Sequence, residues 1–144
     1  MMRFLVAILV LIAGLMMYIR MAPTRPEIWH QVSAVTGASD TQTPGGFRAE
    51  RRINTAAPAV LQAALTRALA TPRTKLIAGN VDEGMMTFET RSLVMGFPDY
   101  TTVAVIGDFL VISGRLRYGR SDMGVNKARI EEWLAALAPL TEPL

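Results

Sequence analysis

The sequence predicts an α+β protein, in which an antiparallel sheet of about five strands is covered by two helices and preceded by one N-terminal transmembrane helix. Three observations support this fold class. Residues 4–19 form an uncharged apolar run. Several short segments alternate polar and apolar residues, as strands with one buried face do. Two later segments repeat apolar residues every three or four positions, as amphipathic helices do. We therefore expect a membrane anchor at residues 1–22, a linker at 23–46 and an α+β domain at 47–144.

The chain is hydrophobic and basic overall, but both properties are concentrated at its start. It has 144 residues, of which 51% are hydrophobic, and its formal net charge is +3. Residues 1–20 are apolar except for Arg3, Gly14 and Arg20. Without the two arginines the net charge is 3 − 2 = +1, and the remaining composition is that of an ordinary globular domain. So small a charge, with no basic stripe, argues against nucleic-acid binding.

The apolar run 4–19 is long enough to act as a membrane anchor. As a helix it measures about 24 Å, and an outward-reaching Arg20 extends the span to Ala22, about 28 Å. A cleaved signal peptide is the alternative, but its cleavage site would be poor because Pro23 directly follows Ala22. We expect an uncleaved helix at residues 4–22, with the domain on the periplasmic side because the short N-terminal tail stays inside.

The remaining elements are expected in the order β-α-β-β-β-β-α. The segment 23–46 is rich in proline, glycine and small polar residues, which are typical of a linker. Gly107 and Asp108 separate two β-rich runs and indicate a two-residue hairpin turn. Two helices on one face would cover a sheet of sequential antiparallel strands. The expected strands are 47–53, 74–79, 85–95, 100–106 and 109–118, and the expected helices are 58–70 and 126–138.

Each expected helix has one apolar face. In the first helix the face consists of Leu61, Leu65, Ala68 and Leu69, and Pro58 suits its first turn. In the last helix, Ile130, Trp133, Leu134 and Leu137 follow the i, i+3, i+4, i+7 spacing of a buried face.

The residues needed for common catalytic and metal sites are missing. The chain has no cysteine and one histidine, which excludes the usual zinc and thiolate sites. That histidine, His30, lies in the predicted linker, where we expect a surface or docking residue rather than a catalyst. The G-x-x-x-x-G spacing at 119–124 is followed by Val125 and Asn126 instead of Lys and Ser or Thr, so it is not a P-loop. We therefore expect no catalytic residue, no metal and no cofactor.

One dense polar cluster, RLRYGRSDMGVNKARI at residues 115–130, lies between the last strand and the last helix. Free N–H groups at a helix start attract anions, and guanidinium groups reinforce the attraction. The cluster is thus a candidate anion-binding loop for a phosphate, a carboxylate or a lipid head group. In the alternative, Asp122 pairs with Arg117 or Arg129 and locks the loop to the sheet. The candidate binding residues are Arg117, Arg120, Ser121, Asp122, Asn126 and Arg129.

This cluster resembles the C-terminal signature of the domain-of-unknown-function 1499 family, R-S-x-S-R-x-G-x-S-D-x-G-x-N-x-x-R followed by Ile, Val or Leu. The sequence departs from the signature upstream, where Ser113, Gly114 and Leu116 replace Arg, Ser and Ser. The resemblance implies a small membrane-tethered or exported domain and no established activity. Residues at matching places are Arg117, Gly119, Ser121, Asp122, Gly124, Asn126, Arg129 and Ile130.

These observations favour a non-enzymatic accessory module, which binds a partner protein or an anionic ligand. We expect it in a bacterial inner membrane as a single-pass protein with a periplasmic C-terminal domain. Two alternatives remain open at this point. One is an enzyme of unrecognised type that acts on an anionic substrate at the Arg/Asp/Asn loop. The other is a single-pass accessory subunit of a membrane complex, which uses the anchor helix as its interface.

Overall fold

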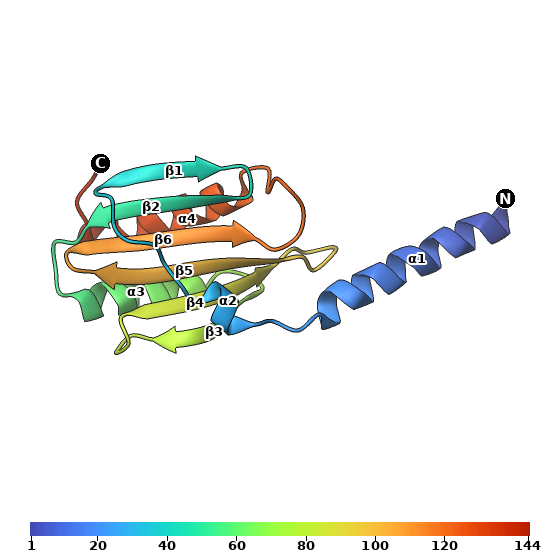
Figure 1. The fold of residues 1–144 in the computed structure, drawn as a ribbon, viewed down its shortest axis with the longest axis horizontal. Coiled ribbons are helices and arrows are strands. Elements are labelled where there is room, and N and C mark those ends of the chain that lie inside the picture. The colour runs from blue at the N-terminus through green and yellow to red at the C-terminus, as the bar shows by residue number, and fades with distance from the viewer.

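The computed structural model describes residues 1–144 and confirms the predicted fold class. A long N-terminal helix extends away from an α+β domain, in which two helices cover one face of an antiparallel sheet (Figure 1). The sheet has six strands where about five were expected. The helices are α1 (Met2–Met21), α2 (Pro26–Trp29), α3 (Ala57–Leu69) and α4 (Val125–Leu137), followed by the short 3-10 helix η1 (Ala138–Leu140). The strands are β1 (Ser39–Thr43), β2 (Gly46–Arg52), β3 (Thr74–Asn80), β4 (Met85–Arg91), β5 (Pro98–Ile106) and β6 (Phe109–Leu116).

Helix α1 is the one helix of the chain that is long and apolar enough to cross a membrane. Its side chains are almost all exposed, and Ile19 is the only buried residue in it. An apolar helix of this length exposed to water would be costly, since each large apolar side chain gains about 1.5–3 kcal/mol on burial. A membrane anchor and a signal sequence both satisfy this description.

The strands lie in the order β1-β2-β6-β5-β4-β3, and every neighbouring pair is antiparallel. The extra strand β1 comes from the segment 23–46 that the composition indicated as a linker. It pairs with β2 across a turn at Pro44 and Gly45 and forms an edge of the sheet. Its sequence SDTQT has no apolar residue, so hydrophobic periodicity could not reveal it, and such polar edges resist pairing with other chains.

Helices α3 and α4 bury the apolar face of the sheet. Phe88 of β4 meets Trp133 of α4 edge to face, with ring centroids 5.7 Å apart, a favourable aromatic geometry. The predicted face of α4 is buried at Ile130, Trp133 and Leu137. The prediction for α3 was partly wrong, because Leu69 at its last position is exposed. The buried residues of α3 are Val60, Leu61, Ala64 and Ala68.

The opposite face of the sheet is polar. A row of polar side chains crosses four neighbouring strands of this face, each residue paired with the next. The row consists of Arg48 on β2, Ser113 on β6, Thr102 on β5 and Thr87 on β4. We call residues 22–38 the strap, since this segment leaves α1 and crosses this face toward β1 (Figure 1). The polar face is therefore closed by a segment of irregular chain and one short helix instead of long helices.

Candidate anion-binding pocket

The C-terminal part of the strap is held by a buried carboxylate on β2. Glu50 is 1% exposed and accepts hydrogen bonds from the backbone amides of Thr36, at 2.8 Å, and Gly37, at 3.0 Å. Its Oε1 also pairs with Nε of Arg48 at 2.7 Å. Burial raises the pKa of the Glu50 carboxyl, but these hydrogen bonds outweigh it, so that the pKa lies below its ordinary value.

A second buried carboxylate, on β4, holds the N-terminal part of the strap. Glu89 is 1% exposed, and its Oε2 accepts a hydrogen bond from the Thr24 hydroxyl at 2.5 Å. Its Oε1 pairs with Arg91 at 2.8 Å and with Lys75 at 3.3 Å. Burial raises the pKa of Glu89, but the hydrogen bonds from Thr24 and Arg91 and the two positive charges lower it below the ordinary value.

Between these two carboxylates the strap is packed on the middle of the sheet. Trp29 stacks on Tyr100 of β5 with ring centroids 4.2 Å apart. A hydrogen bond of 2.9 Å joins Nδ1 of His30 to the hydroxyl of Thr87, which places the single histidine against β4. Together with the two buried carboxylates, these contacts hold the strap on strands β2, β5 and β4.

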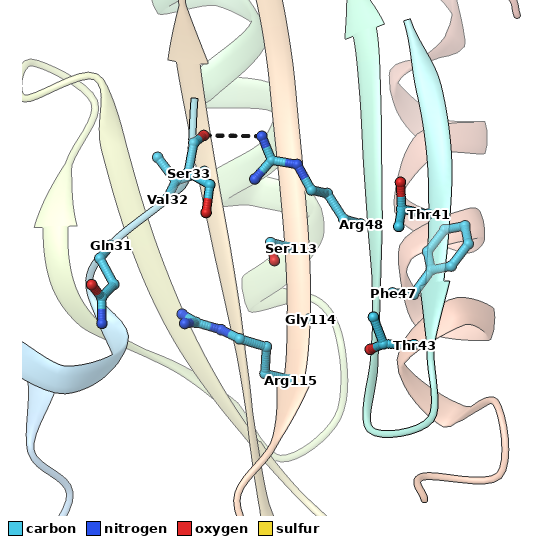
Figure 2. A pocket seen from close by; sticks show the side chains of 10 residues that line it. All are labelled: Gln31, Val32, Ser33, Thr41, Thr43, Phe47, Arg48, Ser113, Gly114 and Arg115. Carbon is cyan, nitrogen blue, oxygen red and sulfur yellow. Dashed lines mark hydrogen bonds between the residues drawn. The ribbon is translucent and has the colours of Figure 1, made fainter. Parts of the chain in front are cut away.

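A cavity of about 490 Å³ lies between the strap and strands β1, β2 and β6. Figure 2 shows two arginines on its sides, with the side chains of Arg48 and Arg115 reaching toward the strap. Hydroxyl groups complete the polar lining. The lining residues are Gln31, Val32, Ser33, Thr41, Thr43, Phe47, Arg48, Ser113, Gly114 and Arg115.

Arg115 is a partly buried cation that pairs with no carboxylate. Its Nη2 donates to the Trp29 carbonyl at 2.6 Å and approaches the Thr102 hydroxyl at 3.5 Å. Its Nε is buried and has no hydrogen-bond partner. Burial lowers the pKa of the Arg115 guanidinium from its ordinary value, although arginine keeps its proton in proteins. An unpaired charge removed from water is costly, and a bound anion would compensate it.

Arg48 stands on the other side of the cavity with part of its guanidinium occupied. Its Nη2 donates to the carbonyls of Ser33 and Ala34, both at 3.0 Å, and its Nε pairs with Glu50. These bonds fix the plane of the guanidinium. The cavity thus offers one unpaired and one oriented guanidinium, together with the Ser113 hydroxyl, and such a donor set suits a carboxylate or a phosphate.

The predicted anion loop has a different arrangement. The carboxylate of Asp122 is buried and accepts the backbone N–H groups of Gly124, at 3.1 Å, and Asn126, at 2.9 Å. The Asp122 carboxylate therefore occupies the two backbone N–H groups at the start of α4 that would otherwise bind an anion. Burial raises the pKa of Asp122, but the hydrogen bonds from Asn126 and Gly124 bring it below the ordinary value.

The structure brings together only part of the predicted loop set. Arg129 pairs with Asp99 at 3.5 Å and donates to Oδ1 of Asn126 at 3.0 Å, so these residues join α4 to β5. Arg117 lies apart from them and donates to the Pro23 carbonyl and the Tyr100 hydroxyl on the strap side. Neither Arg117 nor Arg129 forms an ion pair with Asp122. The remaining members, Arg120 and Ser121, are exposed.

The residues Arg48, Ser113, Glu50 and Glu89 were absent from the predicted site. The signal for the two glutamates was present, because they occupy the polar side of alternating strands, β2 and β4, that each lie one strand in from an edge of the sheet. A charged residue there indicates a partner on the same face. The strap that covers them contains no long periodic element, so its place on the sheet was not evident from the sequence. No group of three His, Asp or Glu side chains is arranged to hold a metal.

The fold and the pocket define a small antiparallel α+β domain that follows one apolar helix of membrane-spanning length. A family model described as "Protein of unknown function (DUF1499)" matches residues 19–137. The chain therefore belongs to the DUF1499 family, as the resemblance in its C-terminal cluster implied. Among curated proteins, none matches the chain. The family match begins at the end of α1 and includes the whole strap.

Proposed function

We propose that the protein is a membrane-anchored, non-enzymatic module whose periplasmic domain binds a small anion, a carboxylate or a phosphate, in the cavity between Arg48 and Arg115. The proposal rests on the surroundings of the Arg115 guanidinium. A guanidinium that lines a cavity, has a buried Nε without partner and pairs with no carboxylate is left short of negative charge. Membrane anchoring is supported by the exposed apolar surface of α1.

A binding role is favoured over catalysis by what lines the cavity. The lining contains hydroxyl groups, one amide and two arginines, with no histidine and no carboxylate. A serine or threonine nucleophile needs a base within hydrogen-bond reach. The residues that line the cavity offer Ser113 no such base. His30 is engaged with Thr87 on β4.

Thermal unfolding of the full chain in detergent tests the pocket, with inorganic phosphate replacing chloride at constant ionic strength. Phosphate at a hundred times its dissociation constant adds about 2.7 kcal/mol of stability to a protein with one site. We expect the wild type to be stabilised and Arg115→Gln to lose the effect. The matched control Arg52→Gln removes the same charge from an exposed position on β2 and should respond like the wild type.

A double variant, Arg117→Gln with Arg120→Gln, separates the cavity from the loop predicted from sequence. It should keep phosphate stabilisation if the cavity is the anion site. Loss of stabilisation in this variant, together with a normal response of Arg115→Gln, would move the site to the loop. A wild type insensitive to both phosphate and acetate would contradict anion binding altogether.

The membrane orientation is tested separately by fusing alkaline phosphatase to the C-terminus. The enzyme is active only after export, so that activity is expected from a periplasmic domain. An inactive phosphatase fusion and a fluorescent cytoplasmic reporter at the same position would contradict the periplasmic placement while leaving the anion pocket unaffected.

A further inference from the structure

The two ends of the sheet differ in their relation to α1. The β4–β5 loop (92–97) and the β6–α4 loop (117–124) lie at one end, together with the α3–β3 connection (70–73). Figure 1 shows this end turned toward α1. We call it the α1 end. The opposite end carries the β3–β4 turn (81–84) and the β5–β6 turn (107–108), and we call it the far end.

The last turn of α1 is attached to the β4–β5 loop. Arg20 donates through Nη2 to the Val94 carbonyl at 2.9 Å. Arg91 donates through Nη1 to the carbonyls of Ile19, at 3.3 Å, and Gly96, at 3.0 Å. A Cβ atom on Gly96 would lie 2.9 Å from Cγ of Arg20, so the contact is close. If α1 spans a bilayer, these bonds hold the loop at the depth of the head groups.

Large exposed apolar side chains gather at the α1 end. Outside residues 1–21 the domain exposes ten of them, and six belong to this end. Leu93 is 70% exposed and Val94 is 68% exposed, at the tip of the β4–β5 loop. Exposed apolar clusters of this kind mark an interaction surface. The six are Leu69, Leu93, Val94, Phe97, Met123 and Val125.

Charge is also divided between the ends. The loops of the α1 end contain Arg73, Arg117 and Arg120, and their one carboxylate, Asp122, is occupied by backbone amides of α4. The turns and C-terminal tail of the far end contain four carboxylates and no lysine or arginine, although Arg52 at the end of β2 lies beside two of them. The far-end carboxylates are Asp82, Glu83, Asp108 and Glu142.

A basic cavity of about 530 Å³ lies where α1 joins the domain. Four cationic side chains line it and the single carboxylate is Glu89, which pairs with Arg91 and Lys75. The other two cations, Arg20 and Arg73, form no ion pair. A cavity with surplus positive charge beside exposed apolar side chains matches the phosphate and acyl parts of an anionic phospholipid.

We propose that the α1 end is a bilayer-contact surface: the tip of the β4–β5 loop enters the leaflet around α1, and the basic cavity receives the phosphate head group of an anionic lipid. This inference rests on the membrane anchoring in the proposed function and is independent of the pocket of Arg48 and Arg115. The acidic far end then faces away from the membrane, where it is not attracted to anionic lipid.

Spin-label depth measurement tests the contact, because the chain has no native cysteine. Leu93→Cys and the matched control Asp108→Cys at the far end are labelled with a nitroxide in the full chain. Both are reconstituted in nanodiscs of three parts phosphatidylcholine to one part phosphatidylglycerol. We expect the label at 93 to collide with dissolved oxygen and to be shielded from a water-soluble nickel chelate, and the label at 108 to show the reverse.

Equal exposure of the two labels to the nickel chelate would overturn the contact surface. A label at Val6→Cys in α1 reports insertion of the anchor in the same nanodiscs. If the label at 6 is shielded from the nickel chelate but the label at 93 is exposed to it, the bilayer-contact surface is rejected and membrane anchoring stands. Exposure of both labels to the chelate rejects membrane anchoring as well.

Lipid retention tests the basic cavity. Native mass spectrometry of the full chain, released from nanodiscs of equal phosphatidylglycerol and phosphatidylcholine, should show more phosphatidylglycerol adducts. Arg73→Gln should reduce this preference about fivefold, the effect of about one basic residue at an anionic surface, while Arg52→Gln should preserve it. Equal retention of the two lipids by the wild type, or an unchanged preference in Arg73→Gln, would reject the head-group site.

Discussion

The two faces of the sheet are closed in different ways. Helices α3 and α4 close one face with apolar side chains, whereas the strap closes the other through the buried carboxylates of Glu50 and Glu89. The helix-covered face gains stability from area removed from water. The strap-covered face exchanges hydrogen bonds with water for hydrogen bonds within the protein, which contribute little net stability and much specificity of position. Stability and ligand binding are therefore expected to depend on different faces.

The largest effect on stability should come from the helix-covered face. Trp133 is 1% exposed and packs against Phe88, so Trp133→Ala leaves a large cavity. We expect a loss of about 3–5 kcal/mol in the free energy of unfolding, measured by thermal or urea unfolding of the full chain in detergent. A loss below about 1 kcal/mol would contradict the assignment of the core to this face.

The next effect tests the hydrogen bonds that hold the start of α4. Asp122→Ala leaves two amides at the start of α4 without their acceptor, and we expect a loss of about 2 kcal/mol. The control Asp108→Ala removes a carboxylate that is 77% exposed at the β5–β6 turn, where a change within about 0.5 kcal/mol is expected. Equal effects of the two variants would remove the structural role assigned to Asp122.

The stability that the strap-covered face contributes should depend on pH. The folded pKa of Glu89 is lower than its ordinary value of 4.5, so its charged form stabilises the fold above that pH. The stabilisation is lost as the pH falls through the lower, folded pKa. The difference in unfolding temperature between the wild type and Glu89→Gln should therefore shrink on acidification below pH 4.5. A constant difference down to pH 2 would show that the charge of Glu89 contributes nothing.

The smallest effect on stability is expected at the pocket. Arg115→Gln removes a hydrogen bond to the Trp29 carbonyl, but it also removes a partly buried charge that lacks a carboxylate. These contributions oppose each other, and we expect a net change within about 0.5 kcal/mol without ligand. Unfolding temperatures in chloride buffer measure it. Destabilisation as large as that of Trp133→Ala would mean that Arg115 is a structural residue.

The helix-covered face could be predicted well from the sequence, because its apolar residues repeat with a regular period. Ile130, Trp133 and Leu137 repeat with the helical period, and Gly107 with Asp108 forms the expected hairpin turn between β5 and β6. Strand β4 ends at Arg91 instead of the expected Met95, because the amide of Ser92 bonds to the Phe97 carbonyl and closes a loop.

The strap-covered face was less predictable. The contacts of Thr24, Trp29 and Thr36 join residues more than ten positions away and follow no period. Composition identified the segment 23–46 only as rich in proline, glycine and polar residues. The charges of the candidate loop are adjacent in the sequence, and Arg115 is the first residue of that cluster. Arg48 comes to the same cavity as Arg115 only when β2 pairs with β6. Charges that are gathered by strand pairing form no local cluster in the sequence.

The most direct test of the central claim is a phosphate titration followed by the side-chain Nε–H resonances of arginine in the ¹⁵N-labelled full chain. We predict that the Arg115 resonance, assigned by its absence from Arg115→Gln, shifts in a saturable way, while that of exposed Arg52 does not. Saturable binding that moves the resonances of Arg117 or Arg120 and leaves Arg115 unchanged would contradict the claim that this cavity is the anion site.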